Sequence, residues 1–308
     1  MSDQSQFNIY RGDGSTIQER NLTLPSYEKI TRIDAPEGYV ASQPLRDAVN
    51  VAIALGQPLL LTGEPGTGKT RLAFSISHEL GLGQPLIFHT KTTSTAKDLF
   101  YRYDSLAHFH DAQLKEKKEL KIKDYITFEA LGQAIMDSPS KRSVVLIDEI
   151  DKAPRDLPND ILNELENMAF SVKETGESFQ AKEANRPILI LTSNSEKNLP
   201  DAFLRRVVYY HIPFPDKEVL TKIVGKRLNL SDSFKANMLQ EAIDHFVEIR
   251  RSKGLRKLPA TAELLAWIHI LDKHKIDLNS DIPEQLTRLA MSYSILAKNK
   301  EDLEKLRR

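Results

Sequence analysis

The sequence of 308 residues contains no cysteine and a single tryptophan, and neither sign of charge is in excess. Without cysteine the chain can form no disulfide, thiolate zinc site or iron–sulfur cluster, and it has no cysteine nucleophile. Its chemistry must therefore use oxygen and nitrogen groups. Lys plus Arg and Asp plus Glu number 43 each, so the net charge is zero. The chain therefore has no overall electrostatic attraction to nucleic acid.

Long hydrophobic runs are also missing. Apolar stretches such as Val51–Leu55 and Leu59–Leu61 are separated by Gly56–Pro58, and they are far shorter than the roughly 20 residues that span a bilayer. Residues 1–20 are polar and charged and lack the apolar stretch of a secretory signal. We therefore expect no membrane insertion and a cytoplasmic location.

The chain is long enough for about two domains, and its character changes along the sequence. Residues 1–35 are rich in Gly, Ser, Asp and Arg, which predicts an extended arm or linker. Residues 36–215 alternate helical and strand patterns, which predicts an α/β core with a parallel sheet. Residues 216–308 show helical spacing with many Lys and Glu, so we expect a separate all-helical subdomain.

Periodicity and turn residues predict the individual elements of the core. The continuous β-branched run at 143–150 is typical of a parallel strand that is covered on both faces. Residues 111–124 are dense in Lys and Glu and are expected to form a solvated helix or loop. The remaining predictions are strands at 59–62, 85–90 and 187–191, helices at 45–55, 70–80, 159–168 and 199–206, and a hairpin turn at 174–177.

Residues 63–70 match the phosphate-binding pattern G-x-x-x-x-G-K-[ST], between a predicted strand and a predicted helix. A glycine-rich loop lets backbone N–H groups converge on phosphate oxygens, and the following helix presents its positive N-terminus to the anion. We expect Lys69 to reach the β- and γ-phosphates of ATP and Thr70 to place its hydroxyl on Mg²⁺. The residues expected to bind ATP in this loop are Gly63, Glu64, Pro65, Gly66, Thr67, Gly68, Lys69 and Thr70.

Two adjacent carboxylates, Asp148 and Glu149, follow the apolar residues 144–147. The strand would deliver both to its carboxyl end, where open α/β sheets bind ligands. Because neighbouring side chains on a strand point in opposite directions, the two acids can serve different purposes. We expect Asp148 to lie on the metal and cofactor side, and Glu149 to activate the water that attacks the γ-phosphate.

Polar groups follow the next predicted strand. Asn194 could hydrogen-bond the γ-phosphate or the water, although taken alone this segment is an ordinary turn. Arg205 and Arg206 end a short predicted helix. Paired arginines usually belong to a solvated surface, but a guanidinium that cannot reach its own nucleotide could reach that of a neighbouring subunit and stabilise the transition state.

Three segments, at 48–70, 144–166 and 187–207, together resemble the AAA+ ATPases, and within them the MoxR-type proteins. The resemblance implies a P-loop NTPase core followed by a helical lid, and a ring, usually a hexamer, with ATP and Mg²⁺ between subunits. In its terms 63–70 is Walker A, Asp148 and Glu149 are Walker B, Asn194 is sensor 1, and Arg205 or Arg206 is the arginine finger. Relatives often work with von Willebrand factor A domain partners.

The sequence departs from this family at two places. MoxR-type proteins carry a sensor 2 arginine in Ser-Pro-Arg, whereas residues 258–263 read L-P-A-T-A-E. Arg256 or Lys257 could supply the missing charge, although a guanidinium and an ammonium are not equivalent. The finger reads Arg-Arg where many relatives have Asp-Arg, which makes Arg206 the nearest match and leaves Arg205 as a second candidate.

Residues 92–103 and 171–183 resemble the places where this superfamily inserts loops that face a pore or a client. Phe100, Tyr101 and Tyr103 could therefore grip a polypeptide, or they could simply pack the sheet. His108 and His110 lie close in sequence but have no convincing third ligand, so we expect no zinc.

The leading functional hypothesis is an ATPase that remodels or activates a client protein. An alternative from a different class is a nucleotide-gated adaptor or signalling switch with slow hydrolysis. A DNA-remodelling protein is weaker because no basic stripe with interleaved aromatic residues is present. A metabolite kinase is weaker still, because it has no need of the acid pair, arginine pair and lid together.

Overall fold

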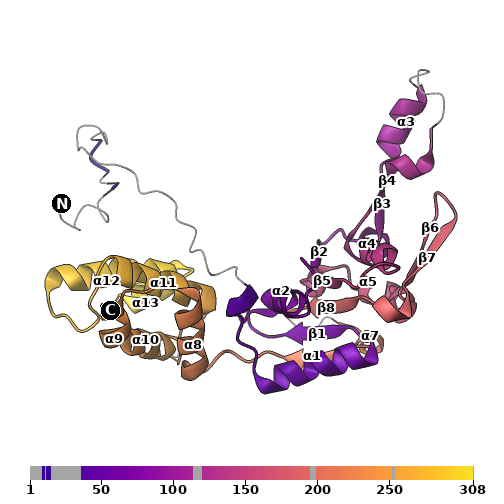
Figure 1. Ribbon diagram of the computed structural model, residues 1–308. Coiled ribbons are helices and arrows are strands. Elements are labelled where there is room, and N and C mark those ends of the chain that lie inside the picture. Colours follow the sequence, from indigo (N-terminus) through magenta and orange to yellow (C-terminus); the bar gives the residue numbers. More distant parts are fainter. Residues whose placement is uncertain are drawn as a thin grey trace. The chain divides into compact units, whose positions relative to one another are not determined.

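The computed structural model describes residues 9–10, 12–14, 36–113, 120–194, 199–251 and 254–307. The chain divides into two units, a core of Ala41–Phe214 and a helical unit that joins Pro215–Arg308 with Met1–Val40 (Figure 1). Nearly all of the predicted arm at 1–35 lies outside the described residues. Residues 36–40 group with the helical unit, whereas the sequence analysis placed them in the core.

The core unit is built on a five-stranded parallel sheet, which confirms the predicted fold class. Its strands follow the order β2-β5-β8-β1-β9, and β5 and β8 are buried along most of their length because helices cover both faces. The edge strand β9 was not predicted from the sequence. The bounds are β1 Leu59–Thr62, β2 Leu86–His89, β5 Val144–Asp148, β8 Ile188–Thr192 and β9 Val208–His211.

Seven α-helices belong to the described part of the core unit. The predicted helix at 159–168 is divided in two at Ile161, which has non-helical backbone angles. The predicted strand at 143–150 ends at Asp148, since Glu149 has a left-handed conformation. The helices are α1 Gln43–Leu55, α2 Lys69–Glu79, α3 Ser105–Gln113, α4 Ala130–Asp137, α5 Leu157–Asp160, α6 Leu162–Asn167 and α7 Asp201–Leu204.

Two β-hairpins extend from the same end of the sheet, β3 Tyr101–Tyr103 with β4 Ile126–Phe128, and β6 Ala169–Val172 with β7 Glu177–Gln180 (Figure 1). The second contains the predicted turn, and the first was not predicted. Their aromatic rings pack together, with Phe128 against Phe170 and Phe179 at centroid distances of 6.1 and 5.7 Å.

This packing decides between the two interpretations of the aromatic segment that begins at Phe100. Phe100 and Tyr101 are 3% and 2% exposed, so the packing interpretation holds for these two residues and they do not offer a surface to a polypeptide. Tyr103 is partly buried and its hydroxyl hydrogen-bonds His108 Nδ1 at 2.5 Å. The ring of His108 also stacks on Tyr125, which gives this histidine a packing role.

In the helical unit the described residues form helices and no β-strand. Trp267, Phe246 and Leu271 are fully buried at its centre. None of the helices in the described ranges is long and apolar enough to cross a membrane. The helices are α8 Lys217–Arg227, α9 Asp232–Asn237, α10 Leu239–Arg251, α11 Thr261–Lys273, α12 Pro283–Leu296 and α13 Lys300–Leu306.

Two helical glycines offer a matched stability test. A Cβ at Gly132 in α4 would lie 1.9 Å from the carbonyl oxygen of Phe100, whereas one at Gly225 in α8 meets nothing within 4 Å. We expect Gly132→Ala to destabilise the protein by about 3 kcal/mol through overpacking. Gly225→Ala should stabilise it by about 0.5–1 kcal/mol, because alanine loses less backbone entropy in a helix. Urea unfolding measures both, and equal effects of the two substitutions would contradict the packing.

Candidate active site

The loop at 63–68 connects β1 to α2 at the carboxyl edge of the sheet. Gly63, Gly66 and Gly68 have φ values of 141°, 78° and 92°, which L side chains rarely adopt. A Cβ at Gly63 would also lie 2.5 Å from the carbonyl oxygen of Ile212. Gly68 provides no side-chain cap for α2. The loop therefore requires glycine for its shape and presents the N-terminal N–H groups of a helix to an anion.

The side chain of Lys69 lies within this loop. Its ammonium donates to the carbonyl oxygens of Gly63 and Glu64 at 2.8 and 3.0 Å, and the residue is 7% exposed. Burial lowers the pKa of Lys69, although nearby carboxylates, with Asp151 the strongest, oppose this shift. The ammonium is thus held by weak carbonyl partners in a position where phosphate oxygens could replace them.

Asp148 connects three elements. Its Oδ1 accepts hydrogen bonds from the hydroxyls of Thr70 at 2.9 Å and Thr192 at 2.7 Å. Its other oxygen lies 3.6 Å from His89 Nδ1. The structure thus brings together Thr70 and Asp148, the two predicted metal ligands, although they are far apart in sequence. Thr192 and His89 were missed because no motif includes them.

Thr70 and Asp148 suit Mg²⁺, a hard cation that takes oxygen ligands and keeps several waters. A protein site for this ion needs only one or two such groups, because substrate phosphates complete the shell. No group of three or more His, Asp or Glu residues that could hold a metal occurs in the ranges that the structure describes. A dedicated all-protein cage is therefore not part of the described chain.

Glu149 departs from the predicted geometry. Instead of alternating with Asp148 along a strand, it has φ 57° and begins a short 3₁₀ turn, Ile150–Lys152. Its backbone N–H donates to Thr192 Oγ1 at 2.8 Å, which helps to hold a conformation that is strained for a residue with a side chain. The turn, rather than strand alternation, separates the two carboxylates.

The carboxylate of Glu149 has two partners. Lys152 Nζ makes a short hydrogen bond and ion pair with its Oε2, and Asn194 Nδ2 lies 3.5 Å from its Oε1. The backbone N–H of Asn194 also donates to Asp151 Oδ1 at 3.3 Å. The predicted residues Glu149 and Asn194 are therefore neighbours, and Lys152 and Asp151 join them.

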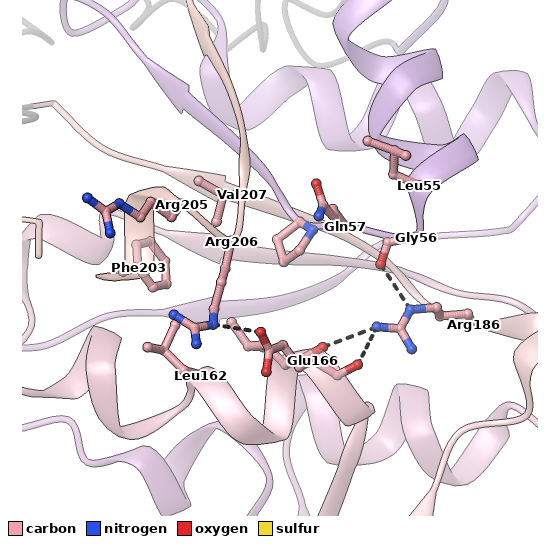
Figure 2. Close-up of a pocket in the computed structure, with 12 residues that line it drawn as sticks. Leu55, Gly56, Gln57, Leu162, Glu166, Arg186, Phe203, Arg205, Arg206 and Val207 are labelled. Atoms are coloured by element: carbon pink, nitrogen blue, oxygen red, sulfur yellow. Dashed lines mark hydrogen bonds and ion pairs between the residues drawn. The ribbon is translucent and has the colours of Figure 1, made fainter. Parts of the chain in front are cut away.

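The arginine pair lies elsewhere. Arg205 and Arg206 line a cavity of about 340 Å³ together with Pro58 and Val207, which precede β1 and β9. The cavity is thus at the amino edge of the sheet, opposite the loop at 63–68. Arg206 points toward Glu166 on α6, whereas Arg205 points away from it (Figure 2). Within one chain the structure does not bring the arginines to the other predicted site residues.

The two candidate lid cations belong to the helical unit. Arg256 Nε pairs with Glu301 Oε2 at 2.9 Å, and the backbone N–H groups of Arg256 and Lys257 donate to the carboxylate of Asp302. Burial by itself would raise the pKa of Asp302, but these donors and Asn299 lower it overall. The C-terminal helix α13 therefore fixes the backbone that carries both cations.

A known family model covers most of the core unit. Residues 58–207 match the family model for the AAA domain of the dynein-related subfamily. Among solved structures, the chain is similar to a single-residue variant of RuvB from Thermotoga maritima, with 14% identity, a TM-score of 0.44, and coverage of 90% of this chain and 72% of that chain. The segment matched by the family model contains the glycine loop, both carboxylates, Asn194 and both arginines. The protein is therefore an ATP-hydrolysing enzyme that carries an AAA+ domain.

Proposed function

We propose that the protein is a MoxR-like AAA+ ATPase that binds ATP with Mg²⁺ at the subunit interfaces of a ring and remodels or activates a client protein. One observation supports the binding of ATP with Mg²⁺ in this proposal. Thr70, Asp148 and Thr192, which come from three different elements, meet through two hydrogen bonds beside the N-terminus of α2. This places oxygen ligands for a cation next to N–H donors for phosphate.

In this proposal the loop N–H groups bind the phosphates of ATP, and Lys69 exchanges its carbonyl partners for β- and γ-phosphate oxygens. The exchange favours the charged ammonium, because phosphate replaces neutral acceptors around a buried cation. Thr70 and Asp148 hold Mg²⁺, which neutralises charge that develops on the phosphates. The loop, the lysine and the two oxygen ligands together bind and orient the substrate.

Glu149 is the proposed base. Its carboxylate accepts the proton of the water that attacks the γ-phosphate, and Asn194, 3.5 Å from it, helps to orient that water. Lys152 pairs with Oε2 of Glu149 in the structure, and opening of this pair would make that oxygen, as well as Oε1, available to water. Exposed ion pairs contribute only about 0–1 kcal/mol, and the change is therefore easily made.

The distance between the arginines and the nucleotide site supports catalysis between subunits. Arg206 lies at the amino edge of the sheet and the glycine loop lies at the carboxyl edge. When the amino edge of one copy meets the carboxyl edge of another, the contact is heterologous. Repeating such a contact closes a ring if the rotation between neighbouring copies allows it. We propose a hexamer in which Arg206, with Arg205 as second candidate, reaches the neighbour's γ-phosphate, and a von Willebrand factor A domain protein as a partner in engaging the client.

The ion pair between Glu149 and Lys152 also favours a second candidate, a nucleotide-gated switch with slow hydrolysis. If this pair persists with ATP bound, the base is occupied and the protein remains in the ATP form. High turnover that a client stimulates supports the remodelling ATPase. ATP-dependent assembly with negligible turnover supports the switch.

Two substitutions separate binding from hydrolysis. Lys69→Ala should abolish ATP binding, because it removes the cation that contacts two phosphates. Glu149→Gln should bind ATP normally but lower kcat by about 10²–10⁴-fold, since an amide cannot accept the proton. Fluorescent-nucleotide titration and phosphate release measure the two properties. Turnover of Glu149→Gln equal to that of the wild type would rule out Glu149 as the base.

Catalysis between subunits can be tested by mixing. Arg206→Ala should lower ATP turnover by about 10³-fold or more, as the loss of an arginine finger does. Adding Lys69→Ala subunits, which keep the arginine but lack a working site, should restore part of the activity in mixed rings. The measurement is the ATPase rate over a range of ratios, with mass from light scattering. Absence of restoration at every ratio would argue against action on a neighbour.

The hydroxyl of Thr192 provides a further test of the site geometry. Thr192→Val removes a donor to Asp148 and leaves the Glu149 N–H without its acceptor, at a cost of about 1–3 kcal/mol. We expect the Kd for ATP to change little and kcat to fall about tenfold. Thr127→Val, at an exposed position in β4, is the matched control and should leave both constants unchanged. A wild-type kcat in Thr192→Val would show that this bond does not orient the acids.

A further inference from the structure

The guanidinium of Arg206 is fixed at two points. Its Nε donates to Glu166 Oε1 at 2.6 Å, and its Nη1 donates to the carbonyl oxygen of Ala202 at 3.0 Å. A guanidinium has five N–H groups in a rigid plane, so two bonds set the orientation of the whole group. The other three N–H groups make no hydrogen bond with any residue that the structure describes, and they include both hydrogens of Nη2.

Glu166 is itself held in place by a second arginine. Arg186 donates through Nη2 to the carbonyl oxygens of Leu165 and Glu166 at 3.3 and 2.8 Å, and through Nε to that of Gly56 at 2.9 Å (Figure 2). These carbonyls lie at the C-terminal ends of α6 and α1, where a cation is favourable. The side chain of Arg186 is only 18% exposed. The backbone of Glu166 is therefore anchored to α1.

The position of Glu166 also connects it to the hydrolytic base. The chain runs from Glu149 through the 3₁₀ turn at Ile150–Lys152 and then through α5 and α6 to Glu166. Ile150, Leu157 and Ile161 in this segment are 1%, 2% and 0% exposed. These three buried side chains anchor the segment to the core, while Glu166 itself stays exposed. The segment that begins at the proposed base Glu149 therefore ends at the acceptor for Arg206.

We propose that Glu166 is a positioning residue for Arg206, and that it holds the guanidinium with its Nη2 edge toward the nucleotide of the adjacent subunit. The inference rests on the proposed function of Arg206 and adds the residue that orients it. Glu166 accepts from Nε alone and leaves both Nη2 hydrogens without a partner among the described residues, although one of them lies on the same edge of the guanidinium as the Nε–H. Its carboxylate therefore restricts the rotamers of Arg206 without blocking the N–H groups that stabilise the transition state.

The bond contributes to orientation and little to stability, because Glu166 and Arg206 are 54% and 42% exposed. An exposed ion pair shifts the population of a side chain by a factor of about two to five. Glu166→Ala should therefore lower kcat per assembled subunit by about two- to fivefold and leave the KM for ATP unchanged. Glu166→Gln, which retains an acceptor oxygen on a side chain of the same length, should recover most of the loss.

The matched control is Asp160→Asn, which also removes one negative charge from an exposed position in the same segment. The second measurement uses mixed rings. Glu149→Gln subunits bind ATP and keep an intact arginine and Glu166, so they should restore the turnover of Glu166→Ala sites that they adjoin. Thermal unfolding of each variant, followed by circular dichroism, separates misfolding from a loss of orientation.

The outcomes distinguish the two proposals. If Arg206→Ala retains wild-type turnover, or if the wild-type rate per subunit does not depend on assembly, the proposed trans finger fails. Suppose instead that Arg206→Ala has a reduced ATP turnover that Lys69→Ala subunits restore, but that the turnover of Glu166→Ala equals that of the wild type or of Asp160→Asn. Only the positioning proposal is then overturned. A rise in the KM of Glu166→Ala for ATP, or a loss that Glu149→Gln subunits fail to restore, would also overturn it, because the defect would then lie in the subunit's own site.

Discussion

The active site depends on one oxygen atom. Oδ1 of Asp148 accepts hydrogen bonds from Thr70 on α2 and Thr192 on β8, while Asp148 itself ends β5. Three elements that are separate in sequence therefore meet at a single carboxylate. Because hydrogen bonds to a charged acceptor are shorter and stronger than neutral ones, this contact fixes the glycine loop relative to the sheet. The same carboxylate is the one that we propose as a ligand of Mg²⁺.

Thr192 extends this constraint to the second acid. The same hydroxyl that donates to Asp148 accepts the backbone N–H of Glu149 at 2.8 Å, so one buried threonine orders both carboxylates. The left-handed conformation of Glu149 directs its chain away from β5 and into a 3₁₀ turn. This turn places Lys152 on the Glu149 carboxylate and Asp151 on the backbone of Asn194. A strained residue at this point is a local cost that the surrounding hydrogen bonds offset.

Features that lie within one short segment could be predicted from the sequence. The glycine loop, the buried strand and the acid pair each need only local spacing, and the parallel sheet follows from the alternation of apolar strands and helices. Contacts between distant segments could not be predicted, because a lone Thr192, His89 or Arg186 carries no pattern. Strand β1 is as short as β9 but begins with three leucines, whereas β3 (Y-R-Y) and β9 (V-Y-Y-H) contain no continuous aliphatic run that would identify them.

The backbone conformation of single residues could not be predicted from the sequence either. The run at 143–150 is apolar up to Ile147, and nothing in its composition indicates that Glu149 leaves the strand. Similarly, the residues at 159–168 have helical spacing, yet the backbone at Ile161 interrupts the helix. In both cases tertiary hydrogen bonds or packing override the local preference. The sequence therefore predicted which residues belong to each element better than it predicted their backbone conformation.

Several arginines and several carboxylates lie at opposite edges of the sheet. Arg142, Arg186 and the pair Arg205–Arg206 each come shortly before a strand, namely β5, β8 and β9, and therefore lie at its amino edge. Asp148, Glu149 and Asp151 lie at or just beyond the carboxyl end of β5. Most of these groups are paired within the chain, since Arg186 and Arg206 pair with Glu183 and Glu166, and Glu149 pairs with Lys152. The proposed head-to-tail ring would bring unlike edges together, and opening of these pairs would then let an arginine of one copy reach the phosphates bound by the next.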